Sequence, residues 1–344
     1  MEFPQVISAN SVTRRSFILQ SSILLASLAI PKNTKGLLQY NTMIEKNMFD
    51  VIIIGGSYSG LAAGLALGRA LRKVLIIDSG MPCNRQTPHS HNFITHDGKT
   101  PAEITSMARQ QVKKYDTVTF LESRVVDGTK VGKGFEIKTE KGEVFNAKKL
   151  IFATGIRDQM PDIEGFSECW GITAIHCPYC HGYEVRNQTT GILANGALAY
   201  EFSMLISNWT QNLTVYTNGK STLTDEQIQK LQKHSIKVVE TEIRRLEHTK
   251  GYMRSLVFKD GAETPLQALY SKRPFTQHSS VPEKMGCEMN DEGYIRTNSF
   301  QKTTIDGIFA CGDNSTRMRT VANAVAMGTT AGMMANKELI EESF

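Results

Sequence analysis

Apolar residues gather in short continuous runs along this chain, and each run ends in glycine or a small polar residue. The first run covers residues 50–54 and is followed by glycines and a leucine–alanine pattern over 61–67. A continuous apolar run of this length predicts a strand buried on both faces, as in a parallel sheet, and the following pattern predicts a helix. Later runs have the same character and predict an α/β fold: 73–78, 150–155 and 307–313.

The turn after the first run has the residue types of a dinucleotide-binding site. Gly55, Gly56 and Gly60 separate the predicted strand from the predicted helix. Backbone N–H groups and the positive end of a helix dipole would then face a pyrophosphate. Ser57 takes the place of the middle glycine and restricts how closely the backbone approaches the phosphates. Asp78 ends the second run about 20 residues later, where a carboxylate binds ribose hydroxyls. An ordinary strand–turn–helix packing site is the alternative.

Between the runs lies the pentapeptide Cys177-Pro178-Tyr179-Cys180-His181. A Cys-x-x-Cys pair can close a disulfide that a thiol or a reduced flavin reopens, and its short loop favours ionisation of one thiol. The same residues match the c-type haem attachment pattern, and two cysteines with nearby histidines also suit a metal ion. Taken alone, the pentapeptide leaves these three hypotheses open.

The order of the four separated motifs over residues 48–344 resembles the low-molecular-weight thioredoxin reductases and their relatives. This resemblance implies two Rossmann-like nucleotide-binding lobes, the second inserted in the first, and FAD as the cofactor. It also implies a homodimer. The cysteine pair then stands where these enzymes carry their redox disulfide, which argues against haem.

The resemblance also assigns residues to FAD beyond the glycine turn and Asp78. The Ala-Thr-Gly turn links the two lobes, the Gly-Asp aspartate holds the ribityl chain, and the start of the final helix lies near the isoalloxazine carbonyls. An arginine in the segment after the second strand is assigned to the flavin side. These residues are Arg85, Ala153, Thr154, Gly155, Gly312, Asp313, Arg319, Thr320, Val321 and Ala322.

The resemblance gives the cysteines separate roles. In the family the second cysteine faces the flavin and the first meets the external thiol, which implies that Cys180 contacts the flavin and Cys177 performs interchange. His181 stands where the reductases usually have an acid–base aspartate. Imidazole titrates near neutral pH, so His181 is a candidate proton acceptor or thiolate stabiliser. The alternative is that His181 only orients the loop.

The second nucleotide motif is degenerate. Residues 191–199 align with a nicotinamide-nucleotide fingerprint, but Ala194 replaces its first glycine. After the apolar run 213–216 the chain has Thr-Asn-Gly-Lys, whereas NADPH-dependent reductases have arginines that pair with the 2′-phosphate. Use of NAD(P)H is therefore in doubt. Residues 177–184 (Cys-Pro-Tyr-Cys-His-Gly-Tyr-Glu) resemble the dithiol oxidases that close disulfides in small molecules such as gliotoxin and reoxidise their flavin with oxygen.

The motifs divide the chain into four predicted parts. Helices are expected over 101–114 and 320–339, and a strand pair over 135–138 and 144–145. The parts are an extension over 1–47, a first FAD-binding segment over 48–157, an inserted cysteine-bearing lobe over 158–285, and a second FAD-binding segment over 286–344.

The extension resembles an export signal. Arg14 and Arg15 precede an apolar stretch over 22–30, as in twin-arginine signals, and this stretch is too short to span a bilayer. Translation from Met43 or Met48 would instead leave a cytoplasmic protein. Both localisations stay open.

Composition supports a folded enzyme. The 344 residues are 40% hydrophobic with a net charge of +5 and no basic run interleaved with aromatics, which argues against a nucleic-acid partner. Three histidines at 89, 91 and 96 lack accompanying ligands at metal-binding spacing, so no metal site is expected. The cysteines outside the pair are expected to be buried: Cys83, Cys169, Cys287 and Cys311.

The sequence therefore predicts an FAD-dependent enzyme that moves two electrons between flavin and the Cys177–Cys180 pair. The favoured hypothesis is a dithiol oxidase, with an NAD(P)H-dependent disulfide reductase as the alternative. A flavin-binding redox sensor is the non-enzymatic possibility. The expected partner is a small-molecule dithiol or a thioredoxin-like protein.

Overall fold

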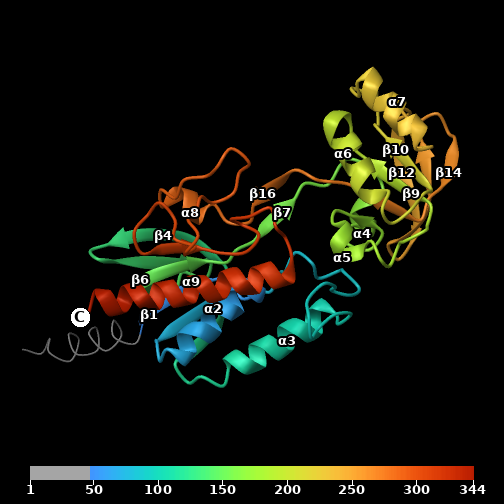
Figure 1. Ribbon diagram of the computed structural model, residues 1–344. Coiled ribbons are helices and arrows are strands. Elements are labelled where there is room, and N and C mark those ends of the chain that lie inside the picture. The colour runs from blue at the N-terminus through green and yellow to red at the C-terminus, as the bar shows by residue number, and fades with distance from the viewer. Residues whose placement is uncertain (1–46) are drawn as a thin grey trace, which may run out of the picture. The chain divides into compact units, whose positions relative to one another are not determined.

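The apolar runs from both ends of the described chain meet in one mixed sheet, which forms the first lobe. The computed structural model describes residues 47–344 (Figure 1). The first predicted run is strand β1, in which Val51, Ile52 and Ile53 are fully inaccessible to solvent. The strands of this sheet are β1 (Met48–Ile54), β2 (Val74–Asp78), β3 (Val118–Glu122), β4 (Val125–Val131), β5 (Gly134–Thr139), β6 (Val144–Phe152) and β17 (Ile308–Ala310).

The strand order places the predicted motifs at one edge of this sheet. The order is β3-β2-β1-β6-β5-β4, with β17 also paired to β6. Strand β1 runs parallel to both β2 and β6, and Ile54 is in register with Ile77 and Phe152. The residues that directly follow these strands therefore meet at the carboxyl edge, where α/β sheets bind ligands.

Two long helices cover one face of the sheet in close contact. Helices α2 (Tyr58–Arg69) and α9 (Val321–Glu341) lie side by side in Figure 1. A Cβ atom on Gly328 would lie 2.0 Å from the carbonyl oxygen of Ser59, so only glycine allows this approach. Helix α3 (Pro101–Val112) and α9 correspond to the helices predicted over 101–114 and 320–339, and α8 (Val281–Lys284) lies on the other side.

The buried cation Lys149 links the final helix to the sheet through ion pairs. Its side chain on β6 is only 5% exposed, and its ammonium lies 2.8 Å from Glu338 and 2.5 Å from Glu342 on α9. Lys302 also reaches Glu338, at 2.9 Å. This network holds the far end of the helix whose N-terminus faces the carboxyl edge of the sheet.

The second lobe contains a smaller parallel sheet in the order β11-β10-β9-β15-β8 and an antiparallel sheet in the order β12-β13-β14. Its helices are α4 (Phe166–Cys169), α5 (Pro178–His181), α6 (Gly196–Ile206) and α7 (Asp225–Lys233). Its strands are β8 (Ala174–Ile175), β9 (Thr190–Leu193), β10 (Leu213–Tyr216), β11 (Lys237–Val239), β12 (Ile243–Thr249), β13 (Tyr252–Phe258), β14 (Glu263–Pro265) and β15 (Ala268–Tyr270).

Two short strands carry the chain out of the first lobe and back. Strand β7 (Ile156–Asp158) pairs antiparallel with β16 (Phe275–Gln277), so the second lobe is attached through two adjacent segments. The predicted boundaries at 157/158 and 285/286 stay predictions. The predicted export signal lies outside the described residues. Within residues 47–344, no helix combines the length and the apolarity that crossing a bilayer requires.

Candidate functional site

A cavity of about 510 Å³ opens at the carboxyl edge of the first sheet and extends to helix α5 of the second lobe. Among the residues assigned to FAD, Gly60, Gly312 and Ala322 do not line it. The others do: Gly55, Gly56, Ser57, Asp78, Arg85, Ala153, Thr154, Gly155, Asp313, Arg319, Thr320 and Val321. Their individual contacts to FAD stay predictions, but the fold brings them to one site.

The glycine turn at this cavity has the form that a pyrophosphate needs. Gly55 has φ +108°, and a Cβ atom there would lie 2.2 Å from the carbonyl oxygen of Ala153. On Gly60 a Cβ atom would lie 1.9 Å from the oxygen of Gly55, so this glycine shapes the turn without lining the cavity. Ser57 caps helix α2 without a side-chain hydrogen bond, which leaves the first N–H groups of the helix for an anion.

Asp78 contacts the same turn. The N–H of Gly56 donates to Asp78 Oδ1 at 3.1 Å, and the carboxylate lines the cavity. Among the described residues the turn donates to this one oxygen only, and the second oxygen suits a ribose hydroxyl. The glycine turn and the carboxylate, about 20 residues apart in the sequence, are therefore in direct contact in the structure.

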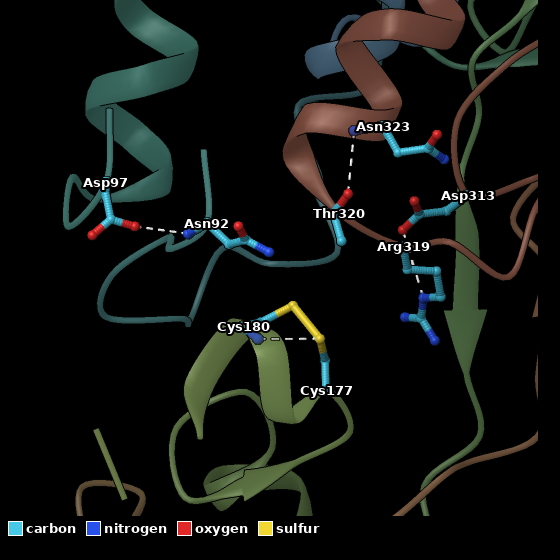
Figure 2. The surroundings of a disulfide bond; sticks show 8 residues. All are labelled: Asn92, Asp97, Cys177, Cys180, Asp313, Arg319, Thr320 and Asn323. Atoms are coloured by element: carbon cyan, nitrogen blue, oxygen red, sulfur yellow. Dashed lines mark hydrogen bonds and ion pairs between the residues drawn. A yellow bond between two sulfur atoms is a disulfide. The ribbon is translucent and has the colours of Figure 1, made fainter. Parts of the chain in front are cut away.

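A buried ion-pair network stands at the other end of the cavity. Arg319 donates two hydrogen bonds to the Asp158 carboxylate, at 2.9 and 2.8 Å, and its Nε lies 3.6 Å from Asp313 (Figure 2). Burial raises the pKa of Asp313, although the Arg319 charge opposes this shift. Burial alone lowers the pKa of Arg319, but the bonds to Asp158 more than reverse the effect.

Sequence reasoning missed Asp158. It lies on β7, the strand that leaves the first lobe, and its side chain is only 7% exposed. The available signal was an acidic residue directly after an apolar strand and its glycine turn. Arg319, which was predicted to lie near the flavin, is therefore bonded to the strand that connects the two lobes.

Two buried polar atoms at this site make no hydrogen bond within residues 47–344. His176 Nε2 has no such partner, and Arg319 Nε has only its ion pair with Asp313 at 3.6 Å; both residues line the cavity. Burial, with the Arg319 charge, lowers the pKa of His176 to about 3, so its imidazole is neutral. Unpaired buried polar atoms are costly unless a ligand or water meets them. Together with the glycine turn, these atoms make the cavity a fitting site for a polar dinucleotide such as FAD.

The predicted redox cysteines form a disulfide. Cys177 caps the short helix α5, the two Cα atoms are 5.3 Å apart, and the N–H of Cys180 donates to Cys177 Sγ at 3.2 Å. Cys180 lines the flavin cavity, whereas Cys177 does not. Figure 2 shows the bond facing the N-terminus of α9 near Thr320. This placement fits a flavin-facing Cys180 and an outward Cys177.

His181 follows Cys180 and lines the same cavity. Burial lowers its pKa; the charge of Glu184 opposes the shift, and a charge on His91 adds to it. The imidazole is therefore neutral at pH 7 and has a free electron pair for a thiol proton. The alternative, in which His181 only orients the loop, stays a second hypothesis.

One cysteine prediction was wrong. Cys169, Cys287 and Cys311 are buried as expected, but the side chain of Cys83 is exposed. The reason is that the segment after β2 passes over the cavity, so Cys83 faces the cavity and not the protein core. The accessible surface of Cys83 faces the cavity, and protein atoms surround the thiol on its other sides. This burial, followed by the Asp313 charge, raises the pKa of Cys83 to about 12. Cys83 is consequently a protonated thiol at neutral pH.

In the second nucleotide motif the Asn195 side chain forms a network of hydrogen bonds with the neighbouring backbone. Asn195 Oδ1 accepts hydrogen bonds from the N–H groups of Gly196 (2.8 Å) and Thr222 (2.8 Å), and from the Thr222 hydroxyl (3.1 Å). Asn195 Nδ2 donates to the carbonyl of Lys220 at 2.9 Å. The first N–H of α6, which a pyrophosphate would contact, is therefore already bonded to the Asn195 side chain, and the same side chain holds the loop after β10 beside it.

Known proteins share this fold and its motifs. The family description "Pyridine nucleotide-disulphide oxidoreductase" matches residues 49–328. The chain is 33% identical over 313 residues to thioredoxin reductase tcpT of Claviceps purpurea, covering 87% of this chain and 97% of that one. Identity to thioredoxin reductase aclD of Aspergillus oryzae is 30%, covering 83% and 95%.

Solved structures of other proteins have the same fold as this chain. An oxidoreductase from Agrobacterium tumefaciens is 37% identical with a TM-score of 0.80, covering 86% of this chain and 99% of that one. The structure of HlmI is 29% identical with a TM-score of 0.81, covering 86% and 93%. These matches confirm the predicted two-lobe fold. The chain belongs to the pyridine nucleotide-disulphide oxidoreductase family and is a thioredoxin-reductase-like, FAD-dependent oxidoreductase that acts on a sulfur group.

Proposed function

We propose that this enzyme oxidises small-molecule dithiols and passes their electrons through the Cys177–Cys180 disulfide and FAD to oxygen. The observation that carries the proposal is the altered nucleotide motif of the second lobe, in which Asn195 bonds the first N–H of α6 and the loop after β10 has no arginine. An enzyme of this family that binds nicotinamide nucleotides poorly needs another electron donor. The dithiol itself supplies two electrons and two protons as it closes to a disulfide.

The loop after β10 argues against NADPH in a second way. The N–H of Ser221 donates to a carboxylate oxygen of Glu240, the residue after β11, at 2.9 Å, so a carboxylate lies against the loop where NADPH-dependent reductases carry arginines. Lys220 is the single cation of that segment, and its carbonyl is bonded to Asn195. A 2′-phosphate would lose guanidinium bonds worth about 1.5–3 kcal/mol each and would approach a negative charge.

The residues take complementary roles in this proposal. One substrate thiolate attacks Cys177 Sγ, which breaks the bond to Cys180 and forms a mixed disulfide. The second substrate thiolate displaces Cys177, so the substrate leaves as a disulfide and both cysteines are reduced. His181, neutral and beside the pair, accepts a thiol proton. Cys177 and Cys180 then close again to the disulfide, giving up two electrons and two protons; bound FAD would accept the electron pair through Cys180 and would transfer it to oxygen, which with two protons becomes hydrogen peroxide.

The decisive experiment is an anaerobic titration of the FAD-loaded protein that follows the flavin absorption band. We expect dithiothreitol to bleach the flavin within the turnover time, millimolar NADPH to bleach it slowly or not at all, and NADH to do slightly better. Readmitted oxygen should restore the band with one hydrogen peroxide per flavin. The Cys177→Ser variant is the matched control, because bleaching that bypasses the disulfide persists in it.

Other outcomes identify the alternatives. Rapid bleaching by micromolar NADPH would overturn the proposal and assign an NAD(P)H-dependent disulfide reductase. Flavin that responds to neither donor would assign a redox sensor. The homodimer and the absence of nucleic-acid and metal partners remain proposals by resemblance and composition.

A further inference from the structure

A second cavity, of about 320 Å³, lies on the solvent side of the redox helix. We call it the groove. One wall is Tyr179, between the two cysteines in the sequence, with Tyr183 and Glu184 just after them. The other wall comes from the first-lobe loop that contains His91 and Asp97. The groove is therefore built jointly by the redox segment and the flavin-binding lobe.

The groove adjoins the flavin cavity. His91 lines both, and the flavin cavity also contains Cys180 and His181. The side chain of His91 is held across the boundary, with Nδ1 3.5 Å from Asp97 and Nε2 3.5 Å from Glu184. A ligand in the groove consequently lies against the helix that carries the disulfide.

Exposed aromatic side chains surround the groove. Tyr179 is 62% exposed and Tyr183 66% exposed, so each ring keeps a large accessible surface. Trp209 packs edge-to-face on Tyr179 with ring centroids 5.6 Å apart. Arg186 stacks on the Tyr183 ring with its guanidinium carbon 3.8 Å from the centroid. These contacts hold both rings in place and leave part of each ring accessible. The volume of the groove is that of a small-molecule site.

The side chains that line the groove carry a net negative charge. Asp97 and Glu184 are 64% and 40% exposed. His91 contacts both carboxylates and contributes one positive charge at most, when its imidazole is protonated. Burial lowers the pKa of the nearby His181, so it adds no positive charge at pH 7. Arg186 lies against Tyr183 but is not among the lining residues. The lining alone is therefore negative with His91 in either protonation state.

We propose that the groove binds the body of the dithiol substrate and selects neutral or cationic dithiols by repelling anionic ones with Asp97 and Glu184. The inference rests on the dithiol-oxidase function proposed above. The aromatic walls cover the apolar part of the substrate, and the carboxylates accept hydrogen bonds from its donors. A carboxylate on the substrate would instead face two charges of the same sign.

The test compares two dithiols that differ by one charge, dihydrolipoamide and dihydrolipoate. Rates of anaerobic flavin reduction are measured at low concentrations, where the second-order constant is obtained. We expect the wild-type enzyme to prefer the amide by about tenfold, equivalent to about 1.4 kcal/mol of repulsion. In the double variant Asp97→Asn, Glu184→Gln, the ratio should fall toward one, and 0.5 M salt should reduce it in the wild type.

A matched control removes the same charge elsewhere. Asp291 and Glu201 are exposed carboxylates, one in each lobe, and neither lines a cavity described above. The double variant Asp291→Asn, Glu201→Gln should keep both the activity and the wild-type ratio. Bound-flavin absorbance and circular dichroism establish that each variant is folded.

The outcomes separate this inference from the proposed function. Equal rates for both dithiols in the wild type, or an unchanged ratio in the groove variant, would overturn the groove while leaving the oxidase intact. Reduction by dithiothreitol but by neither lipoyl compound would likewise overturn it, since the groove is assigned to such small dithiols. Flavin that no dithiol reduces would instead remove the proposed function itself.

Discussion

Replacing Asp158 by asparagine tests whether the buried ion pair with Arg319 stabilises the flavin end of the site. The substitution keeps the side-chain volume and removes the charge that accepts two hydrogen bonds at 2.9 and 2.8 Å. Asp158 and Arg319 are 7% and 14% exposed, so solvent compensates little for the lost partner. Breaking a buried pair costs about 3–5 kcal/mol. Because Asp313 remains 3.6 Å from Arg319 Nε, we expect about 3 kcal/mol.

Thermal unfolding at pH 7 measures this cost. The midpoint shift per kcal/mol falls with chain length and reaches about 2 °C at 250 residues, so about 3 kcal/mol in Asp158→Asn should lower the midpoint by up to about 6 °C. The control is Glu288→Gln, which removes a carboxylate from an exposed pair with Arg296 at 2.9 Å, with side chains 57% and 65% exposed. Exposed pairs contribute about 0–1 kcal/mol, so the control should shift the midpoint by about 2 °C or less.

Added FAD distinguishes two origins of the loss. Since a ligand that binds only the folded state raises the midpoint, each variant is measured at one fixed concentration and again with excess FAD. A deficit in Asp158→Asn that persists at saturating FAD belongs to the ion pair itself. Equal shifts in Asp158→Asn and Glu288→Gln would refute the reasoning, because burial would then make no difference.

Two further predictions concern the redox segment. Cys177→Ser should show a long-wavelength charge-transfer band, because it leaves the Cys180 thiolate facing the flavin, whereas Cys180→Ser should not; bands of equal strength in both variants would reverse or erase the assigned roles. The rate of flavin reduction by dithiothreitol should fall as pH drops below 6.5 through the lowered pKa of His181, because the protonated imidazole cannot accept a proton. A His181→Gln variant with the same acid limb would assign that limb to another group.

Much of the fold could be predicted because its signals are local. The run 50–54, the glycine turn and Asp78 obey rules that involve neighbouring residues or a fixed spacing of one βαβ unit. The structure places all three at one edge of the sheet, with Gly56 donating to Asp78. The order of the motifs then indicated the family, which the comparisons confirm.

The contacts between distant segments could not be predicted. Asp158 and Arg319 are 161 residues apart, and nothing in either segment specifies the other. His91 and Glu184 meet across the two lobes for the same reason. Cys83 was expected in the core because free cysteines are commonly buried, but the fold turns its segment over the cavity. Sequence patterns report which face of an element is buried, not which loop covers a ligand site.

The second nucleotide motif shows how one position changes the chemistry of a lobe. The sequence identified Ala194 and the missing arginines, both of which remove favourable contacts. The structure adds that the Asn195 side chain already accepts hydrogen bonds from the N–H groups of Gly196, at the start of α6, and of Thr222 in the neighbouring loop. A missing contact weakens a ligand, whereas a satisfied network must be broken before the ligand enters. The same kind of strand–turn–helix unit therefore has an open glycine turn beside a cavity in the first lobe and a turn bonded to Asn195 in the second, which supports the proposal that electrons reach the flavin through the thiol pair.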